Sequence, residues 1–96
     1  MPRLVWLPSA IGDLARLHDF LTAKNRDAAR RAVRTIRQGV ATLHLHPEIG
    51  RPAEDRPPGW REWLVPFGGG MYVVLYRYDG ETVVIVAVKH GREAGY

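Results

Sequence analysis

Histidine and arginine are the residue types in this sequence best suited to chemistry, because they transfer protons or bind anions. His90 and Arg92 stand close together near the C-terminus, and Arg61 and Arg77 lie in two separate apolar runs upstream. Neither a Ser-His-Asp arrangement nor a paired-carboxylate site is recognisable, and a single histidine without an oriented partner is a weak catalytic centre. These residues favour binding of an acidic group over proton transfer.

A second histidine pair, His44 and His46, suggests metal ligation at first sight. Residues two apart point to different sides of a helix, and no Cys or carboxylate completes a ligand set. We therefore expect these histidines to interact with the end of a helix, where the dipole favours positive charge. The glycines at 68–70 are not followed by the Lys-Ser or Lys-Thr pair of a phosphate-binding loop, so we expect a turn there. For the protein as a whole we expect neither a metal nor a cofactor.

The charge balance points to an acidic partner. The net charge is +4, and only Lys24 and Lys89 among the 14 basic residues are lysines, so arginine dominates the basic surface. A guanidinium group suits carboxylate as well as phosphate, and net charge alone does not choose between a protein and a nucleic acid. Several of these arginines would follow one face of a helix, which is also how an ordinary solvated face looks: Arg30, Arg31, Arg34 and Arg37.

Length and composition fit one domain spanning residues 1–96. The chain has no cysteine, which makes a reducing cytoplasm its natural compartment. The longest apolar run covers residues 83–88, far below the ~18 residues that a membrane helix needs. We expect neither membrane insertion nor export.

Apolar spacing predicts two helices in the first half. The first would be capped by Ser9 and run to about Lys24, and the second would follow a cap at Asn25 and end before Pro47. Each carries an apolar stripe at spacings of three and four residues: Ala10, Leu14, Leu17 and Leu21 on the first, and Ala29, Val33, Ile36, Val40 and Leu43 on the second. Their short connection predicts an antiparallel helical hairpin.

The second half predicts strands. Runs rich in β-branched and aromatic residues cover 60–65, 71–78 and 82–90, after a short strand at 4–7. Asp79-Gly80 predicts a two-residue hairpin loop with Arg77 opposite Thr82, which puts Arg77 and His90 roughly 26 Å apart. A three-glycine loop would place Arg61 opposite Arg77. The fold class is α+β, with an N-terminal strand and a helical hairpin packed on one face of an antiparallel sheet.

This register makes both faces of the sheet apolar. One face would hold Tyr72, Val74, Tyr76, Tyr78, Val83, Ile85 and Ala87, and the other would hold Met71, Val73, Leu75, Arg77, Val84, Val86, Val88 and His90. Two helices cover only one face. The other needs cover from the chain ends, a second copy or a different molecule, and we expect it to bind a partner.

The order of several short motifs resembles the ParE branch of the RelE/ParE toxin superfamily over nearly the whole chain. The residues that carry the resemblance are Trp6-Leu7-Pro8, Ala10, Asp13-Leu14, Asn25, Ala28-Ala29, Leu43, His46-Pro47, Gly50-Arg51-Pro52, Arg61-Glu62, Val74-Leu75-Tyr76-Arg77, Val88 and His90-Gly91-Arg92. The resemblance implies a bacterial toxin of a type II toxin–antitoxin pair. It also implies a cognate ParD-like antitoxin whose C-terminal segment wraps the toxin in a hetero-oligomer and covers the second face.

The superfamily contains two mechanisms. RelE-type members cut mRNA on the ribosome with basic residues on the open face of the sheet, whereas ParE-type members lack that set and are associated with poisoning DNA gyrase. Here Trp63 follows Arg61, and Val73 stands where an RNA-cleaving member would carry a basic side chain. The resemblance thus favours a non-enzymatic gyrase inhibitor. His90 resembles the C-terminal-strand histidine of some RNA-cleaving relatives, so an mRNA endoribonuclease is the alternative.

The sequence identifies no catalytic residue. The candidate residues for binding antitoxin or target are Arg61, Trp63, Val73, Leu75, Arg77, Val86, His90 and Arg92.

Overall fold

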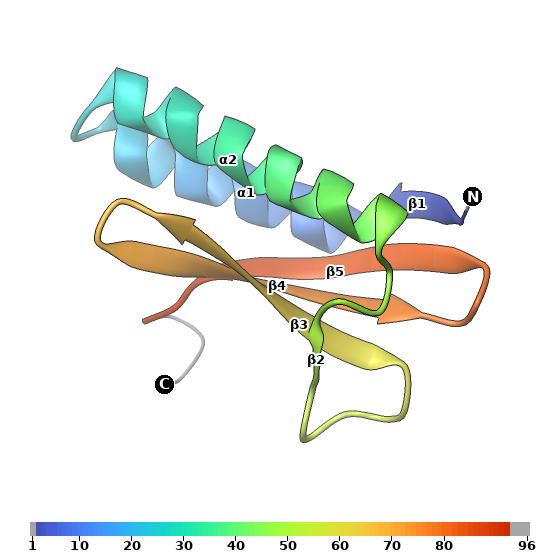
Figure 1. The fold of residues 1–96 in the computed structure, drawn as a ribbon. Helices are drawn as coiled ribbons and strands as arrows, with labels where there is room; N and C mark the ends of the chain where they lie inside the picture. The colour runs from blue at the N-terminus through green and yellow to red at the C-terminus, as the bar shows by residue number, and fades with distance from the viewer. Residues whose placement is uncertain (1, 93–96) are drawn as a thin grey trace.

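Two antiparallel helices lie side by side across one face of a five-stranded sheet (Figure 1). The computed structural model describes residues 2–92. Its elements are β1 (Arg3–Trp6), α1 (Pro8–Thr22), α2 (Arg26–Leu45), β2 (Arg51–Pro52), β3 (Trp60–Phe67), β4 (Gly70–Tyr78) and β5 (Thr82–His90). The strand order is β1-β5-β4-β3-β2. The predicted α+β class is confirmed, although the sheet is mixed rather than wholly antiparallel, because β1 runs parallel to β5.

The two helices begin differently. Asn25 caps α2 as predicted, since its side chain accepts a hydrogen bond from the amide of Ala28 at 3.1 Å. The predicted Ser9 cap is wrong: Leu7 is the N-cap of α1, and Pro8 occupies the first turn, where its missing N–H costs nothing. The Ser9 hydroxyl instead donates to the carbonyl of Val86 in β5 at 2.6 Å, and so ties the start of α1 to the sheet.

The core lies between the helical hairpin and the sheet. Both predicted helical stripes are buried there, except that Leu21 and Val33 are only half-buried and Ala32 is buried in addition. From the sheet, the buried residues facing the helices are Val65, Tyr72, Val74, Tyr76, Val83, Ile85 and Val88. Tyr76 has no exposed surface, and its hydroxyl accepts a hydrogen bond from the amide of Gly50 and donates one to the carbonyl of Pro47. None of the described helices is long and apolar enough to cross a membrane.

The pairing of β4 with β5 differs from the predicted register in two ways. The connection is longer than two residues, because the Asp79 carboxylate accepts hydrogen bonds from the amides of both Glu81 and Thr82, each at 2.9 Å. Arg77 therefore lies opposite Val84 rather than Thr82.

The second difference is an irregularity within β5. Tyr76 pairs with Ile85 and Leu75 pairs with Ala87, so Val86 is an extra residue between the two pairs. The extra residue reverses the faces beyond it. Val88 is fully buried under the helices, His90 lies opposite Tyr72 on the same side, and Ala87 moves to the other face, so the predicted faces of these three residues are wrong.

The turn between β3 and β4 contains two glycines rather than three. Phe67 pairs with Gly70, and Gly68 adopts a φ of 59°, which favours glycine. This one-residue change places Arg61 opposite Tyr76 instead of Arg77. A shift of one residue exchanges the faces of a strand, so Arg61 lies on the helix side of the sheet.

Candidate functional site

The face of the sheet turned away from the helices carries both apolar and charged side chains. The charged residues that strand alternation and pairing place on it are Arg3, Arg51, Glu62, Arg77 and Lys89, and Arg51 and Glu62 form an ion pair at 3.1 Å. Arg77 lies among the apolar residues of this face, and we call this group the open face: Val5, Trp60, Leu64, Val73, Leu75, Arg77, Val84 and Ala87. Within residues 2–92 no helix lies against this face (Figure 1). Val5 is 37% exposed and Val73 only 4%, and the other apolar members are half-buried. The open face is thus an apolar surface available for contact.

One edge of the open face is basic and aromatic. The guanidinium of Arg77, opposite Trp60 across β3 and β4, lies 5.9 Å from the centre of the indole ring. Arg56, from the preceding loop, places its guanidinium 5.1 Å from the same ring. The amides of Thr82 and Glu81, together with Arg77, hold the pKa of the Asp79 carboxyl below its usual range.

Arg61 and Trp63 do not belong to the open face. The Arg61 guanidinium donates to the carbonyls of Gly50 at 2.6 Å and Glu48 at 3.1 Å, which fastens the segment after α2 to β3. The Trp63 indole donates to the carbonyl of Gly39 in α2 at 3.0 Å. Both residues therefore hold the fold together, and the predicted like-charge pair between Arg61 and Arg77 does not exist.

His90 lies on the helix side near the opposite end of the sheet. Its ring packs edge-on against Tyr72 with the ring centres 5.6 Å apart, and its Nδ1 accepts a hydrogen bond from the amide of Arg92. Tyr72, opposite His90, is five positions from Arg77 along β4, which corresponds to about 17 Å rather than 26 Å. His90 and Arg77 also point to opposite faces, so they do not act on one reacting atom.

The remaining candidates fall on different parts of the sheet. Val73 and Leu75 lie on the open face, and Val86 is the extra residue of β5. The structure thus brings together Val73, Leu75 and Arg77, adds Trp60 to them, and separates them from Arg61, Trp63 and His90. The alternation of side chains along β3 could have placed Trp60 beside Arg77 in the sequence analysis, but only with the correct pairing of β3 and β4.

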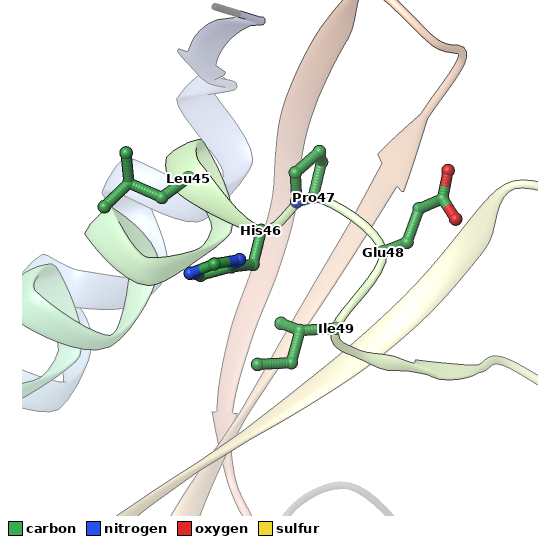
Figure 2. A pocket seen from close by; sticks show the side chains of 5 residues that line it. All are labelled: Leu45, His46, Pro47, Glu48 and Ile49. Carbon is green, nitrogen blue, oxygen red and sulfur yellow. The ribbon is translucent and has the colours of Figure 1, made fainter.

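The two histidines at the end of α2 have separate structural roles. A ring nitrogen of His44 donates to the carbonyl of Pro2 at 2.7 Å, which links α2 to β1. His46 is the C-cap of α2, and its ring lines a shallow hollow of about 500 Å³ together with Leu45, Pro47, Glu48 and Ile49 (Figure 2). Among the described residues, no three metal-ligating side chains come together.

The outer surface of the helical hairpin holds a hollow that the sequence does not reveal. We call it the helical groove; it has a volume of about 550 Å³ and is lined by His18, Arg30, Val33, Arg34, Arg37, Gln38 and Ala41. Val33 was expected in the core stripe, but Ala32 takes the core position and leaves Val33 half-buried in this groove. The arginines read as a solvated helix face therefore border an apolar floor.

Comparison with known proteins supports the class that the fold suggests. A family model described as the ParE toxin of the type II toxin–antitoxin system parDE matches residues 4–95. Toxin RelE3 of Caulobacter vibrioides is 34% identical over 86 residues, which is 90% of each chain. Toxin RelE1 of the same organism is 32% identical over 81 residues, which is 84% of each chain.

Two solved structures share the arrangement of helices and strands. One, the chromosomal ParDE toxin–antitoxin system of P. aeruginosa, superposes with a TM-score of 0.76 at 25% identity over 94% of this chain and 96% of the other. The other, the RelBE2 toxin–antitoxin complex of Mycobacterium tuberculosis, has a TM-score of 0.65 at 25% identity over 94% and 99%. Fold and sequence together define a toxin of a type II toxin–antitoxin system in the RelE/ParE class. Within that class, the chain belongs to the ParE toxin family.

Proposed function

We propose that this toxin arrests growth by binding DNA gyrase, without catalysing a reaction of its own, and that a cognate ParD-like antitoxin seated on the open face holds it inactive. The observation that carries the proposal is the separation of the three candidate residues Arg61, Arg77 and His90. Arg77 lies on the open face, whereas Arg61 and His90 lie on the helix side, and Arg61 is engaged by two backbone carbonyls. A nuclease centre needs acid, base and anion-stabilising groups around one reacting atom, and these residues do not converge.

The open face supports the antitoxin part of the proposal. Its aliphatic residues, Leu64, Leu75 and Val84, are suited to apolar side chains of a polypeptide, and Arg77 adds a cation for an acidic residue. The solved relatives from P. aeruginosa and M. tuberculosis are described as toxin–antitoxin assemblies. A hetero-oligomer in which the antitoxin covers the open face fits both observations.

Cleavage of mRNA on the ribosome is the second candidate. It is favoured by the names of two relatives, Toxin RelE3 and Toxin RelE1, and by the nearness of His90 and Arg92 at the end of β5. Against it, Val73 is buried and apolar at a position where the family resemblance expects a basic side chain in an RNA-cleaving member.

Induction of the toxin without antitoxin separates these mechanisms. For a gyrase poison, we expect growth arrest with accumulated DNA breaks and intact transcripts, and co-expressed antitoxin should restore growth. Cleaved transcripts with intact DNA would overturn the gyrase proposal in favour of the nuclease. Undisturbed growth would contradict both mechanisms and indicate a binding module without toxicity.

A further inference from the structure

We propose that Arg56, Trp60 and Arg77 form the surface through which the toxin holds its protein target, and that they receive an acidic side chain of that protein. We call these three residues the arginine–indole cluster. The inference rests on the proposed function, because the target it concerns is the gyrase of that proposal. The cluster lies at one end of the open face, on the side of the sheet turned away from the helices (Figure 1).

Both guanidinium groups of the cluster rest against the same ring. Their central carbons lie 5.1 Å (Arg56) and 5.9 Å (Arg77) from the centre of the Trp60 indole. Both arginines are exposed, and neither side chain forms a hydrogen bond or an ion pair with another described residue. A guanidinium held on a ring keeps its planar donors available for a carboxylate, and it loses less freedom on binding than an unrestrained one.

Two other arginines of the sheet are already engaged. Arg51 of β2 pairs with Glu62 at 3.1 Å, and Arg61 of β3 donates to two backbone carbonyls of the segment after α2. Those two side chains join strands or segments of the fold. The guanidinium groups of the cluster form no such bond within residues 2–92, so their donors are available to a second molecule.

Acidic residues around the cluster favour a polypeptide over a nucleic acid. The amide of Tyr78 donates to the carbonyl of Gly59 at 2.9 Å, which holds the loop of Arg56 beside the end of β4. Four carboxylates lie in this loop and in the turn after β4: Glu54, Asp55, Asp79 and Glu81. They would repel the successive phosphates of a nucleic acid, whose binding depends on neutralising several of them. A single acidic side chain of a protein needs only the two guanidinium groups.

The residues beside the cluster also suit a protein surface. Val84 lies opposite Arg77 and Leu75 precedes it by two positions on the same face, and both aliphatic side chains are half-buried. Binding energy at protein interfaces is concentrated in Trp, Tyr and Arg residues, with surrounding contacts that exclude water. We therefore expect the target to present one acidic side chain flanked by apolar ones.

The position of the cluster provides a means of neutralisation. Trp60 and Arg77 belong to the open face, which the antitoxin covers in the proposed function. Two proteins cannot occupy the same side chains at once, so an antitoxin seated there excludes the target. The target surface thus has to overlap the open face for this cover to silence the toxin.

Alanine substitutions in the cluster test the inference. The readout is the dissociation constant of the toxin for purified gyrase holoenzyme, measured by calorimetry with and without DNA, and circular dichroism checks folding. We expect Trp60→Ala and Arg77→Ala each to weaken binding at least about tenfold, and Arg56→Ala to weaken it less, because Arg56 comes from a loop at the border of the face. Arg77→Lys keeps the charge without the planar donors and should lose part of the affinity.

The matched control removes a cation from the same side of the sheet. Lys89 lies opposite Val73, which is four positions from Arg77 along β4, or roughly 13 Å. Lys89→Ala should change the affinity for gyrase by less than about twofold. If Trp60→Ala fails to fold, the exposed Arg56 and Arg77 still report on the cluster.

The outcomes separate the inference from the proposed function. Gyrase binding that all three alanine variants retain would overturn the cluster as the target surface and leave the gyrase proposal standing. Absence of gyrase binding by the unaltered toxin would overturn both. A loss confined to gyrase with DNA would assign the cluster to nucleic acid and overturn the inference. An equal loss from Lys89→Ala would also overturn it, because net charge alone would then account for the effect.

Discussion

The carboxylate of Asp13 on α1 accepts a hydrogen bond from the backbone amide of Val88 in β5 at 2.9 Å. The two residues are 75 positions apart in the chain. β1 pairs with β5 only as far as Ile85, so the outer edge of β5 lacks a strand partner beyond that point. Asp13, together with the Ser9 hydroxyl, takes the place of the missing strand.

We expect Asp13→Ala to lower the free energy of unfolding by about 1–3 kcal/mol, because it leaves the amide of the buried Val88 without a partner. Asp13→Asn keeps an acceptor and should lose less. Urea denaturation with an unchanged m-value measures the difference. Asp19, whose side chain is 84% exposed on the same helix, is the control; equal losses from Asp13→Ala and Asp19→Ala would contradict the role of the bond.

Gly50 should not tolerate a side chain. A Cβ there would lie 2.6 Å from the Tyr76 hydroxyl and 2.7 Å from the carbonyl oxygen of Glu62. We expect Gly50→Ala to destabilise the fold by about 1–3 kcal/mol, as overpacking typically does. Gly12→Ala on α1 meets open space and should instead stabilise by about 0.5–1 kcal/mol. The two melting temperatures should move in opposite directions, and a shared direction would contradict this reading.

The tyrosine beneath Gly50 makes stability sensitive to alkaline pH. Burial raises the pKa of Tyr76, although the hydrogen bond from Gly50 and the charge of Arg61 act in the opposite direction. A raised pKa means that the fold favours the protonated phenol. The contribution of the protonated Tyr76 phenol to the free energy of unfolding is complete below the pKa of about 10 in the unfolded chain. It is lost as the pH rises through the pKa in the folded protein. Tyr76→Phe should lower stability at neutral pH and reduce its further decline above about pH 10, as measured by urea unfolding across that range. An unchanged alkaline decline would argue against Tyr76 as its source.

Arg61 and Arg77 should respond differently to replacement by alanine. Arg61→Ala removes two charge-assisted bonds to the segment after α2, so we expect a loss of about 1–3 kcal/mol in unfolding free energy. Arg77 is exposed, so Arg77→Ala should lower the free energy of unfolding by less than about 1 kcal/mol. The same substitution should weaken the binding of the antitoxin. Unfolding and calorimetry on both variants make the comparison. Normal stability in Arg61→Ala would show that its bonds are dispensable.

Local spacing was sufficient for the helices and for the existence of the strands. The Asn25 cap and most of the apolar stripe positions depend on nearby residues, and they were predicted correctly. The strand register was not predicted correctly. Residues 83–88 are all apolar, so no polar residue marks which side chains face which side, and the sequence gives no sign that Val86 is an extra residue. Similarly, three successive glycines do not specify which two form the turn. The candidate site inherited both errors: Arg61 and His90 moved to the helix side, while Trp60 joined the open face.

The pairing of β1 with β5 has a consequence for how the toxin comes into being. Of the described strands, β1 leaves the ribosome first and finds its neighbour only after β5, the last of them, has been translated, so the sheet stays incomplete until then. Prematurely terminated products lack the partner of β1 and cannot assemble the native fold. The sheet of this toxin is therefore complete only after residues 82–90 have been made.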